Sequence, residues 1–395
     1  MNIYQPHPFA GVPEMESSLR RPILVIGAGV AGTVCALRLR QLGVDVHLAE
    51  RARFPRSKVC GCCIGGAGLS VLELVDLKDW ILDHGQITRQ WLGSLGGYRV
   101  EVPIESGVAI SREMLDTELL SRVERLGTTI HAPVTASVDS IHQDRVTVTM
   151  NHANGDSHQL DYEMVVLASG LNATGSNRLL PWIEVPHGPF GASFFADVDH
   201  LAPGVIAMAC SADGYVGAVR LEDDRVDVAA ALTAGASAGT NGNPMIRILG
   251  ILEQSELGLG KVEASSPIKV TPPLRRARLA GYGRLVAIGD ASGYVEPFTG
   301  EGMTWGMMSG YELANLIALS ADQLDQIGEK WCRHQRQLLG SRRRACRILT
   351  SVLQSSVARG GAGYLLSRIP SLTTPVTSHL SRPWRSPLLP QIKNR

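Results

Sequence analysis

Three glycines near the N-terminus constrain the fold more than any other feature of the chain. Gly27, Gly29 and Gly32 follow the apolar run 23–26 and open the segment 30–42, whose apolar residues have helical spacing. A glycine-rich turn between a buried strand and a helix lets the backbone approach a pyrophosphate, and the helix N-terminus favours its negative charge. We therefore expect the strand–turn–helix unit of a doubly wound fold that binds a dinucleotide. The residues predicted to contact this dinucleotide are Gly27, Ala28, Gly29, Val30, Ala31 and Gly32.

An acidic residue is expected at the end of the second strand of this unit. Residues 44–48 alternate between apolar and polar side chains, and Glu50 follows them closely. In dinucleotide-binding folds a carboxylate at this place binds the hydroxyl pair of a ribose. Glu50 is therefore the predicted ribose ligand.

A second glycine-rich segment lies much later in the chain. Gly289 and Asp290 close the apolar run 285–288, where a carboxylate can accept hydrogen bonds from the hydroxyls of a ribityl chain. Gly300 and Glu301 open a helix expected over 301–319, and the dipole at that helix start favours negative charge on a reduced flavin ring. Together the two segments predict FAD. The predicted contacts in the second segment are Gly289, Asp290, Pro297, Gly300, Glu301, Gly302 and Met303.

The order of these motifs resembles a known family. The early glycines with Glu50-Arg51, a mid-chain Arg112-x-x-Leu115-Asp116 and the late Gly-Asp…Pro…Gly-x-Gly resemble FAD-dependent oxidoreductases of the p-hydroxybenzoate hydroxylase type, over about residues 20–320. Within that superfamily, Lys58-Val59-Cys60-Gly61 and Gly214-Tyr215-Val216-Gly217 resemble the geranylgeranyl reductase branch. The resemblance implies that Glu50, Arg51, Lys58, Cys60 and Arg112 contact FAD, and that Asp290 contacts its ribityl chain.

Two segments depart from the family pattern. Ala168-Ser169-Gly170 stands where the hydroxylase type usually has Ala-Asp-Gly, a segment associated with FAD and the nicotinamide cofactor. The chain therefore lacks this carboxylate, which argues against direct use of NADPH, and NAD(P)H is kept only as a candidate reductant. The aromatic substrate motif of the prenyl reductases is also reduced, with Val216 and Gly217 in place of a bulky ring. Tyr215 remains the predicted substrate contact.

Three cysteines cluster in the sequence Cys60-Gly61-Cys62-Cys63. Thiols beside a flavin can transfer electrons or donate a proton, and small soft side chains can equally pack beside the cofactor. Zinc binding is not indicated, because no second Cys/His pair stands at the required spacing. Cys60 and Glu301 are the predicted catalytic residues.

The expected fold is α/β. It combines a doubly wound, Rossmann-like FAD-binding domain carrying an inserted antiparallel meander, a β-rich substrate domain and a helical C-terminal extension. Three alternating strands over 129–160, the last two joined at Asn154-Gly155, predict the meander. The predicted boundaries are 20–186 and 273–320 for the two parts of the FAD-binding domain, 187–272 for the substrate domain and 321–395 for the extension.

Composition limits the partners of the chain. Lysine plus arginine, 38 residues, nearly equals aspartate plus glutamate, 37 residues, so no basic field argues for nucleic acid. The chain shows no export signal and no long apolar run, and its seven cysteines suggest reduced thiols, so a cytoplasmic location is expected. The arginine-rich segment 330–347 is a candidate for contact with an anionic membrane surface, with a solvated face or an acidic protein as alternatives.

The predicted function is an FAD-dependent oxidoreductase acting on a hydrophobic small molecule. The main hypothesis is reduction of carbon–carbon double bonds by hydride transfer from reduced flavin. The alternative is a flavin monooxygenase that hydroxylates or epoxidises an aromatic or polyketide-like substrate, which the fold alone does not exclude. A halogenase is disfavoured, because the tryptophan-rich signature of that branch is absent. A non-catalytic FAD carrier remains a third hypothesis.

Overall fold

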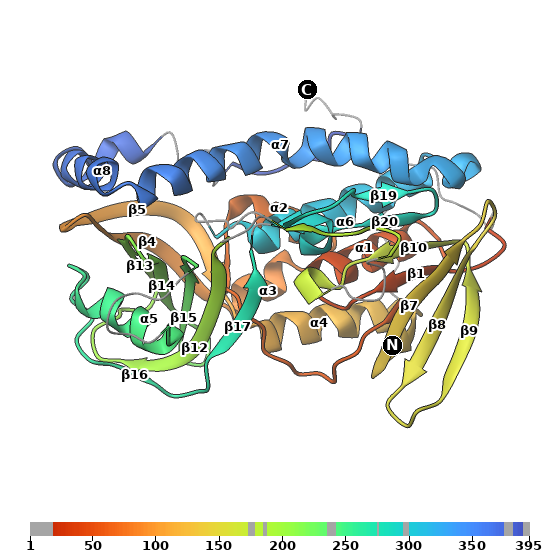
Figure 1. Cartoon of the computed structure of the whole chain (residues 1–395), viewed down its shortest axis with the longest axis horizontal. Coiled ribbons are helices and arrows are strands. Elements are labelled where there is room, and N and C mark those ends of the chain that lie inside the picture. Colours follow the sequence, from red (N-terminus) through yellow and green to blue (C-terminus); the bar gives the residue numbers. More distant parts are fainter. Residues whose placement is uncertain are drawn as a thin grey trace.

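The structure is a computed structural model of the whole chain that describes residues 19–172, 178–184, 188–234, 242–274, 276–294, 300–374 and 382–389. Two sheets form the two ends of the molecule, and one long helix, α7 (Ile327–Gln354), runs along both of them (Figure 1). The predicted α/β class with a helical C-terminal region is confirmed. Within these residues, no helix is both long enough and apolar enough to cross a bilayer.

A six-stranded sheet forms the expected doubly wound unit. Five of its strands are parallel, and β19 is antiparallel to β20 at one edge. The four residues of β1 are all buried, because helices cover one face of this sheet and antiparallel strands cover the other. In spatial order the sheet consists of β6 (Thr129–His131), β2 (Val46–Ala49), β1 (Ile23–Ile26), β10 (Met164–Leu167), β20 (Leu285–Ala287) and β19 (Gly281–Tyr282).

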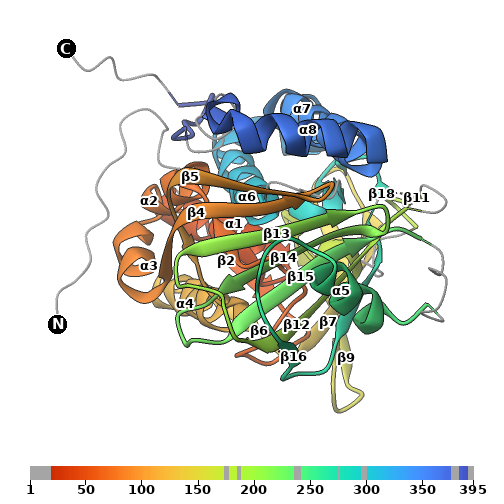
Figure 2. The same cartoon turned by 90° about the vertical axis from the view of Figure 1, so that its left-hand side faces the viewer.

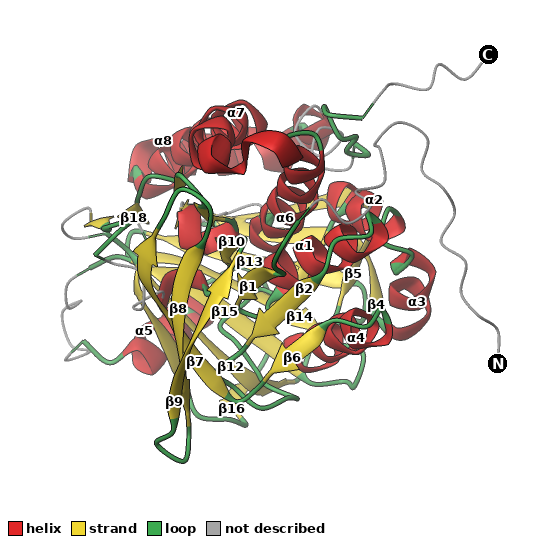
Figure 3. Cartoon of the chain, turned by 90° about the vertical axis from the view of Figure 1, so that its right-hand side faces the viewer, coloured by secondary structure: helices red, strands yellow, loops and turns green. Residues whose placement is uncertain are grey.

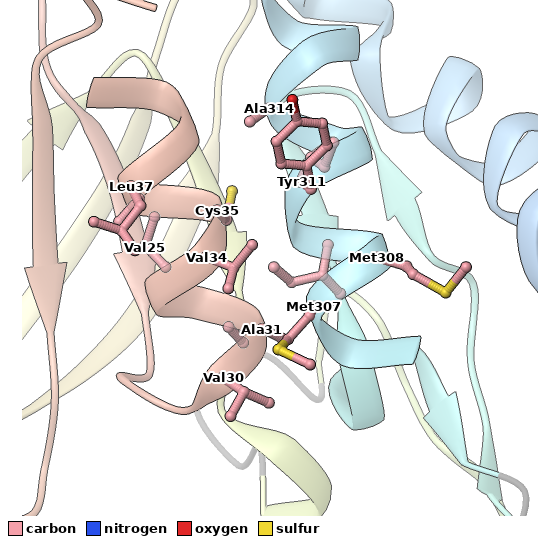
Figure 4. Packing of buried hydrophobic residues seen from close by; sticks show 14 of the residues in the cluster. Val25, Val30, Ala31, Val34, Cys35, Leu37, Met307, Met308, Tyr311 and Ala314 are labelled. Carbon is pink, nitrogen blue, oxygen red and sulfur yellow. The ribbon is translucent and has the colours of Figure 1, made fainter. Parts of the chain in front are cut away.

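Two helices that follow the two glycine-rich segments pack directly on each other. They are α1 (Val30–Gln41) and α6 (Gly302–Ala318), and Figure 4 shows their apolar side chains interleaved. A Cβ atom added at Gly310 of α6 would lie 2.3 Å from the carbonyl oxygen of Ala31 in α1. The close approach therefore depends on glycine, and it brings the two motifs together although they lie far apart in the sequence.

The predicted meander is confirmed as a separate antiparallel sheet. It consists of β7 (Val134–Ile141), β8 (Val146–His152) and β9 (Ser157–Tyr162), with the turn at Asn154-Gly155 joining the last two strands. Figure 3 views the molecule from the end that carries these strands. Their inner apolar residues pack against the six-stranded sheet, so the meander covers the sheet face opposite α1.

The second large sheet has nine strands and combines segments from distant parts of the chain. A β-rich domain was expected over 187–272, but β3, β4 and β5 precede the predicted boundary at residue 186 and pair into the same sheet. The predicted domain division therefore cuts across a continuous sheet. The strands are β16 (Val262–Ala264), β12 (Phe190–Val198), β15 (Val226–Leu232), β14 (Gly214–Arg220), β13 (Val205–Ser211), β4 (Gln86–Leu95), β5 (Tyr98–Ala109) and β3 (Cys63–Ile64), with β17 (Lys269–Pro273) also paired to β12.

Helices cover both faces of this sheet. In Figure 2 the helix α5 lies on one side of the strands, and α7 and α8 lie on the other. The segment 66–84 forms two helices rather than one, because Asp76 has a φ of 57° and interrupts it. The remaining elements are α2 (Gly66–Glu73), α3 (Lys78–His84), α4 (Arg112–Arg125), α5 (Pro244–Glu253), α8 (Ser356–Arg368), β11 (Ile183–Glu184), β18 (Arg276–Ala277), β21 (Gly293–Tyr294) and the 3₁₀ turns η1 (Gly170–Asn172), η2 (Gly289–Ser292), η3 (Ala321–Gln326) and η4 (Pro370–Thr373).

Candidate active site

The early glycine turn has a backbone that only glycine can supply. Gly27 has a φ of 112°, and a Cβ there would lie 2.6 Å from the carbonyl oxygen of Ala168. A Cβ added at Gly32 would lie 2.0 Å from the carbonyl oxygen of Gly27 and would clash with it. These two glycines therefore fix the turn and the strand–helix packing, while Gly29 begins α1 and faces a cavity. Two glycines that shape the turn and one that faces the ligand are expected in a phosphate-binding turn.

The carboxylate of Glu50 is held by backbone amides. Its Oε2 accepts a hydrogen bond from the Ala28 amide at 2.8 Å, and its Oε1 accepts one from the Ala52 amide at 2.9 Å. Arg56 lies 3.5 Å from the same carboxylate. Glu50 thus ends β2 beside the glycine turn, as expected, although it does not line the cavity itself.

Two cations face the glycine turn. The position that a Gly29 Cβ would occupy lies 3.2 Å from Lys58 Nζ and 3.7 Å from Arg112 Nη2. Arg112 starts α4, where Ser111 caps the helix, and it donates two hydrogen bonds to Asp116, at 3.0 and 2.7 Å. Burial and the positive charge of Arg112 lower the pKa of Lys58 to about 8. Two like charges held together in this way are stabilised by a bound anion.

The late motif lies against the same cavity and is tied to α7. Gly289 has a φ of 56°, and burial raises the pKa of the adjacent Asp290. Glu301 accepts a hydrogen bond from Arg342 at 2.6 Å, and Arg343 donates to the carbonyl oxygen of Gly293 at 3.1 Å. The predicted contact Pro297 lies outside the described residues.

The cysteine loop joins the two sheets. Cys62 has a φ of 51°, an uncommon conformation for a residue other than glycine, and its carbonyl accepts from the Ile110 amide at 2.9 Å. A hydrogen bond from the Cys62 thiol lowers the pKa of Cys60 to about 6, and the Arg112 guanidinium acts in the same direction. The pKa of Cys62 rises correspondingly. Cys60 therefore carries a thiolate near neutral pH, whereas burial raises the pKa of Cys63.

A buried carboxyl group of the nine-stranded sheet lies beside this loop. Asp227 belongs to β15, is 4% exposed, and its Oδ2 has no hydrogen-bond partner among the described residues. Burial, followed by the negative charge of Cys60, raises its pKa well above the ordinary value. Asp227 therefore favours its protonated form more strongly than an aspartate in water does.

One cavity of about 930 Å³ connects these groups. It begins at the two glycine-rich segments, passes the cysteine loop and Asp227, and continues between the nine-stranded sheet and helices α7 and α8. The predicted site residues that line it are Gly29, Val30, Ala31, Arg51, Lys58, Cys60, Arg112, Tyr215, Gly289, Asp290, Gly300, Glu301, Gly302 and Met303. Gly27, Ala28, Gly32 and Glu50 lie behind this lining and shape the turn.

The residues present fit FAD. A pyrophosphate suits the glycine turn at the N-terminus of α1, because backbone amides and the cations Lys58 and Arg112 face the same space there. The absence of a side chain at Gly29 leaves this space open to a phosphate. Asp290 and the start of α6 suit the ribityl chain and the flavin ring.

Comparison with known proteins agrees with this reading. Residues 21–204 match the pyridine nucleotide-disulphide oxidoreductase family. Digeranylgeranylglycerophospholipid reductase 1 of Methanopyrus kandleri is 24% identical over 317 residues, which cover 77% of this chain and 81% of that protein. The chain is an FAD-dependent oxidoreductase. Menaquinone reductase of Mycobacterium tuberculosis matches this oxidoreductase with 23% identity, over 75% of this chain and 76% of that protein.

Solved structures share the fold of the oxidoreductase. The flavin-dependent brominase Bmp2 aligns with a TM-score of 0.77 at 16% identity, covering 91% of this chain and 93% of that one. The flavin-dependent halogenase CmlS aligns with a TM-score of 0.70 at 21% identity over 81% of this chain, which spans only 62% of the halogenase. These similarities confirm the expected fold class.

Sequence reasoning missed two parts of the site. Asp227 was not singled out, although an acidic residue within the apolar strand 226–232 is a signal that could have identified it. The cavity wall formed by α7 and α8 was also missed. Its residues Leu349, Leu353 and Leu366 read as ordinary apolar positions of a helix, and only the packing of α8 on β4 and β5 places them at the cavity.

Proposed function

We propose that this oxidoreductase reduces carbon–carbon double bonds in the hydrocarbon chain of a lipid-like substrate. The observation that supports this proposal is the placement of a buried carboxyl group with a raised pKa, Asp227, in an apolar cavity that leads away from the FAD site. Reduction of a double bond adds a hydride to one carbon and a proton to the other. The site therefore needs an acid that stays protonated at neutral pH.

Bound FAD, once reduced, supplies the hydride. The chain itself would hold the phosphates of FAD with Lys58, Arg112 and the glycine turn, and the raised pKa of Asp227 would let its carboxyl group supply the proton. The thiolate of Cys60 interacts electrostatically with both the cation Arg112 and this acid, and its negative charge raises the pKa of Asp227. We propose NADH or NADPH as the source of electrons.

The shape and chemistry of the cavity support a long apolar substrate. Beyond the cysteine loop its lining is mainly aliphatic and aromatic, as is usual for sites that bind hydrophobic ligands. The two curated relatives are named for reducing a digeranylgeranyl glycerophospholipid and menaquinone. The apolar side chains of this part of the cavity are Trp91, Leu95, Val102, Ile206, Met208, Val219, Leu349, Leu353 and Leu366.

An anaerobic single-turnover experiment tests the proposal. The FAD-loaded protein is reduced with dithionite, NADH or NADPH and mixed with geranylgeraniol without oxygen. We expect the yellow flavin absorbance to return and the alkene to gain two hydrogen atoms by mass spectrometry. Reoxidation that requires oxygen, with a product that gains an oxygen atom, would instead favour the monooxygenase alternative that the fold also permits.

Replacement of the acid separates its role from cofactor binding. We expect Asp227→Asn to slow single-turnover reoxidation by the alkene by about 10² to 10⁴-fold, the usual contribution of a general acid, while FAD still binds. Glu105→Gln is the matched control, because Glu105 also lines the cavity but is exposed. Equal rates for wild type and Asp227→Asn would remove Asp227 from the mechanism.

A further inference from the structure

The last part of the chain carries only positive charge. Glu329 is its last acidic residue, and every charged side chain from Lys330 to Arg395 is a lysine or an arginine. The chain as a whole is nearly balanced, with 38 basic and 37 acidic residues, so this asymmetry is local. The C-terminal helices therefore present a cationic surface attached to a nearly neutral protein.

The arginines of α7 divide into two groups. Arg342 and Arg343 face the protein, where they donate to Glu301 and to the carbonyl oxygen of Gly293. Arg333, Arg336, Arg344 and Arg347 are exposed, and Arg368 at the end of α8 is also exposed. Exposed positive charge thus extends along α7 and reaches the end of α8.

Exposed apolar side chains gather on the same elements. On α8, Val357, Tyr364 and Leu365 are 85%, 50% and 51% exposed, and their helical spacing places them on one face. Such a concentration on a single face marks a surface that contacts another apolar phase. We call it the C-terminal apolar face, and it consists of Ile348, Val357, Tyr364, Leu365, Ile369 and Leu372.

The cavity reaches this face. Val352 and Leu372 line the cavity and are also 38% and 51% exposed at its outer end. Ala362 and Leu366 of α8 line the same cavity from within. A hydrocarbon chain leaving an apolar phase at the C-terminal apolar face would therefore enter the cavity without crossing water.

We propose that the C-terminal apolar face docks on an anionic lipid bilayer and admits the substrate from it. This docking proposal rests on the proposed function, because both require a lipid-like substrate. The apolar side chains enter the boundary between head groups and acyl chains, while Arg344, Arg347 and Arg368 contact the anionic head groups. The arrangement of an apolar stripe flanked by basic residues is typical of helices that lie in the plane of a membrane interface.

A second copy of the chain fits this face less well. Isologous association of two such surfaces would place the exposed arginines of one copy near those of the other, and like charges in close contact oppose association. A bilayer with anionic lipids offers the opposite charge together with an apolar interior. It therefore satisfies both features of the C-terminal apolar face.

Vesicle flotation with the full-length protein tests the docking. Wild type is mixed with vesicles of phosphatidylcholine alone, or of phosphatidylcholine with phosphatidylglycerol. We expect flotation with the anionic vesicles and much weaker flotation with the neutral ones. Raising the ionic strength should weaken binding, because salt screens the head-group charge. Absence of wild-type binding to anionic vesicles would overturn the proposal.

Two sets of variants locate the contact. Arg344→Glu with Arg347→Glu should lower partition to anionic vesicles by tenfold or more, since each basic residue near such a surface contributes about fivefold. Val357→Asp with Leu365→Asp should lower partition to a similar degree by removing apolar contact. The controls are Ile246→Asp, which changes a 50% exposed apolar residue on α5, and Arg89→Glu on β4.

The outcomes separate docking from catalysis. Flotation needs no turnover, so it can succeed even if the anaerobic alkene test fails. Unchanged partition of both variant pairs, or an equal loss in the controls, would overturn the assignment to the C-terminal apolar face. A concentration-dependent dimer that these variants abolish, without vesicle binding, would assign the face to a second copy instead.

Discussion

The pKa of a single buried carboxyl group connects the site to stability. Asp227 is 4% exposed, and burial raises its pKa above that of an aspartate in the unfolded chain. Between those two values the folded protein binds a proton that the unfolded chain has lost. The contribution of Asp227 to stability is therefore fully present at acidic pH and is lost as pH rises through its folded pKa.

This linkage predicts how Asp227→Asn behaves. Relative to the variant, wild type should lose free energy of unfolding as pH rises from about 4, by up to about 1.4 kcal/mol for each pH unit until the folded pKa is reached. Urea unfolding of both proteins, in the same cofactor state across this pH range, measures the difference. Parallel pH dependences would show that Asp227 is ionised in the folded protein.

Cys60 provides a second residue-level prediction. Its pKa of about 6 means that the thiolate dominates at pH 7, whereas burial raises the pKa of Cys210 to about 12. We expect iodoacetamide to label Cys60 in the native protein with a rate that reaches half its maximum near pH 6, and to leave Cys210 unlabelled. Peptide mass spectrometry identifies the sites. A midpoint near that of a free thiol, about 8.5, would contradict the assigned thiolate.

At the scale of elements, the contact between α1 and α6 organises the FAD site. These helices begin at the two glycine-rich segments, and their close packing holds both segments at one cavity. The sequence predicts each helix, but it does not show that they touch. The closeness depends on Gly310, whose missing side chain leaves room for the backbone of α1.

Replacing this glycine should loosen the helix pair. We expect Gly310→Ala to lower the free energy of unfolding by about 1 to 3 kcal/mol, because its Cβ would overlap the Ala31 carbonyl. Gly340→Ala on α7 is the matched control, since nothing lies within 4 Å of its added Cβ. Alanine has the higher helix propensity, so the control should be neutral or more stable by up to about 1 kcal/mol. Chemical unfolding of both variants decides whether packing or propensity governs the change.

At the scale of the whole molecule, FAD should stabilise the folded chain as one unit. The predicted site residues come from both glycine-rich segments, the cysteine loop and the nine-stranded sheet, so ligand binding requires all of them to be folded. A free FAD concentration of one hundred times Kd should add about 2.7 kcal/mol to the free energy of unfolding.

Gly29→Val should remove this stabilisation. Its side chain would extend toward Lys58 Nζ and obstruct the approach of a phosphate to the turn, whereas the cofactor-free fold can adjust by moving the end of a flexible lysine. Gly250→Ala on α5, with open space around its added Cβ, should keep the full effect. Thermal unfolding with and without FAD measures both. Full FAD stabilisation of Gly29→Val would contradict the assigned phosphate site.

The sequence alone determined the parts of this protein that depend on local patterns. A glycine turn between an apolar strand and a helix needs a backbone conformation that few residues adopt. The spacing of Gly27, Gly29 and Gly32 was therefore enough to predict this turn. Alternating apolar residues around Asn154-Gly155 likewise predicted the meander. The fold class and the cofactor follow from such signals.

Only the tertiary structure decided what faces the substrate. The pairing of β4 with β13 and the packing of α8 on β4 and β5 join segments whose separation in the chain no local pattern records. These contacts bring Asp227 to the cysteine loop and α7 to the late glycine motif. Burial then changes the chemistry, because it raises the pKa of Asp227 above that of an aspartate in water.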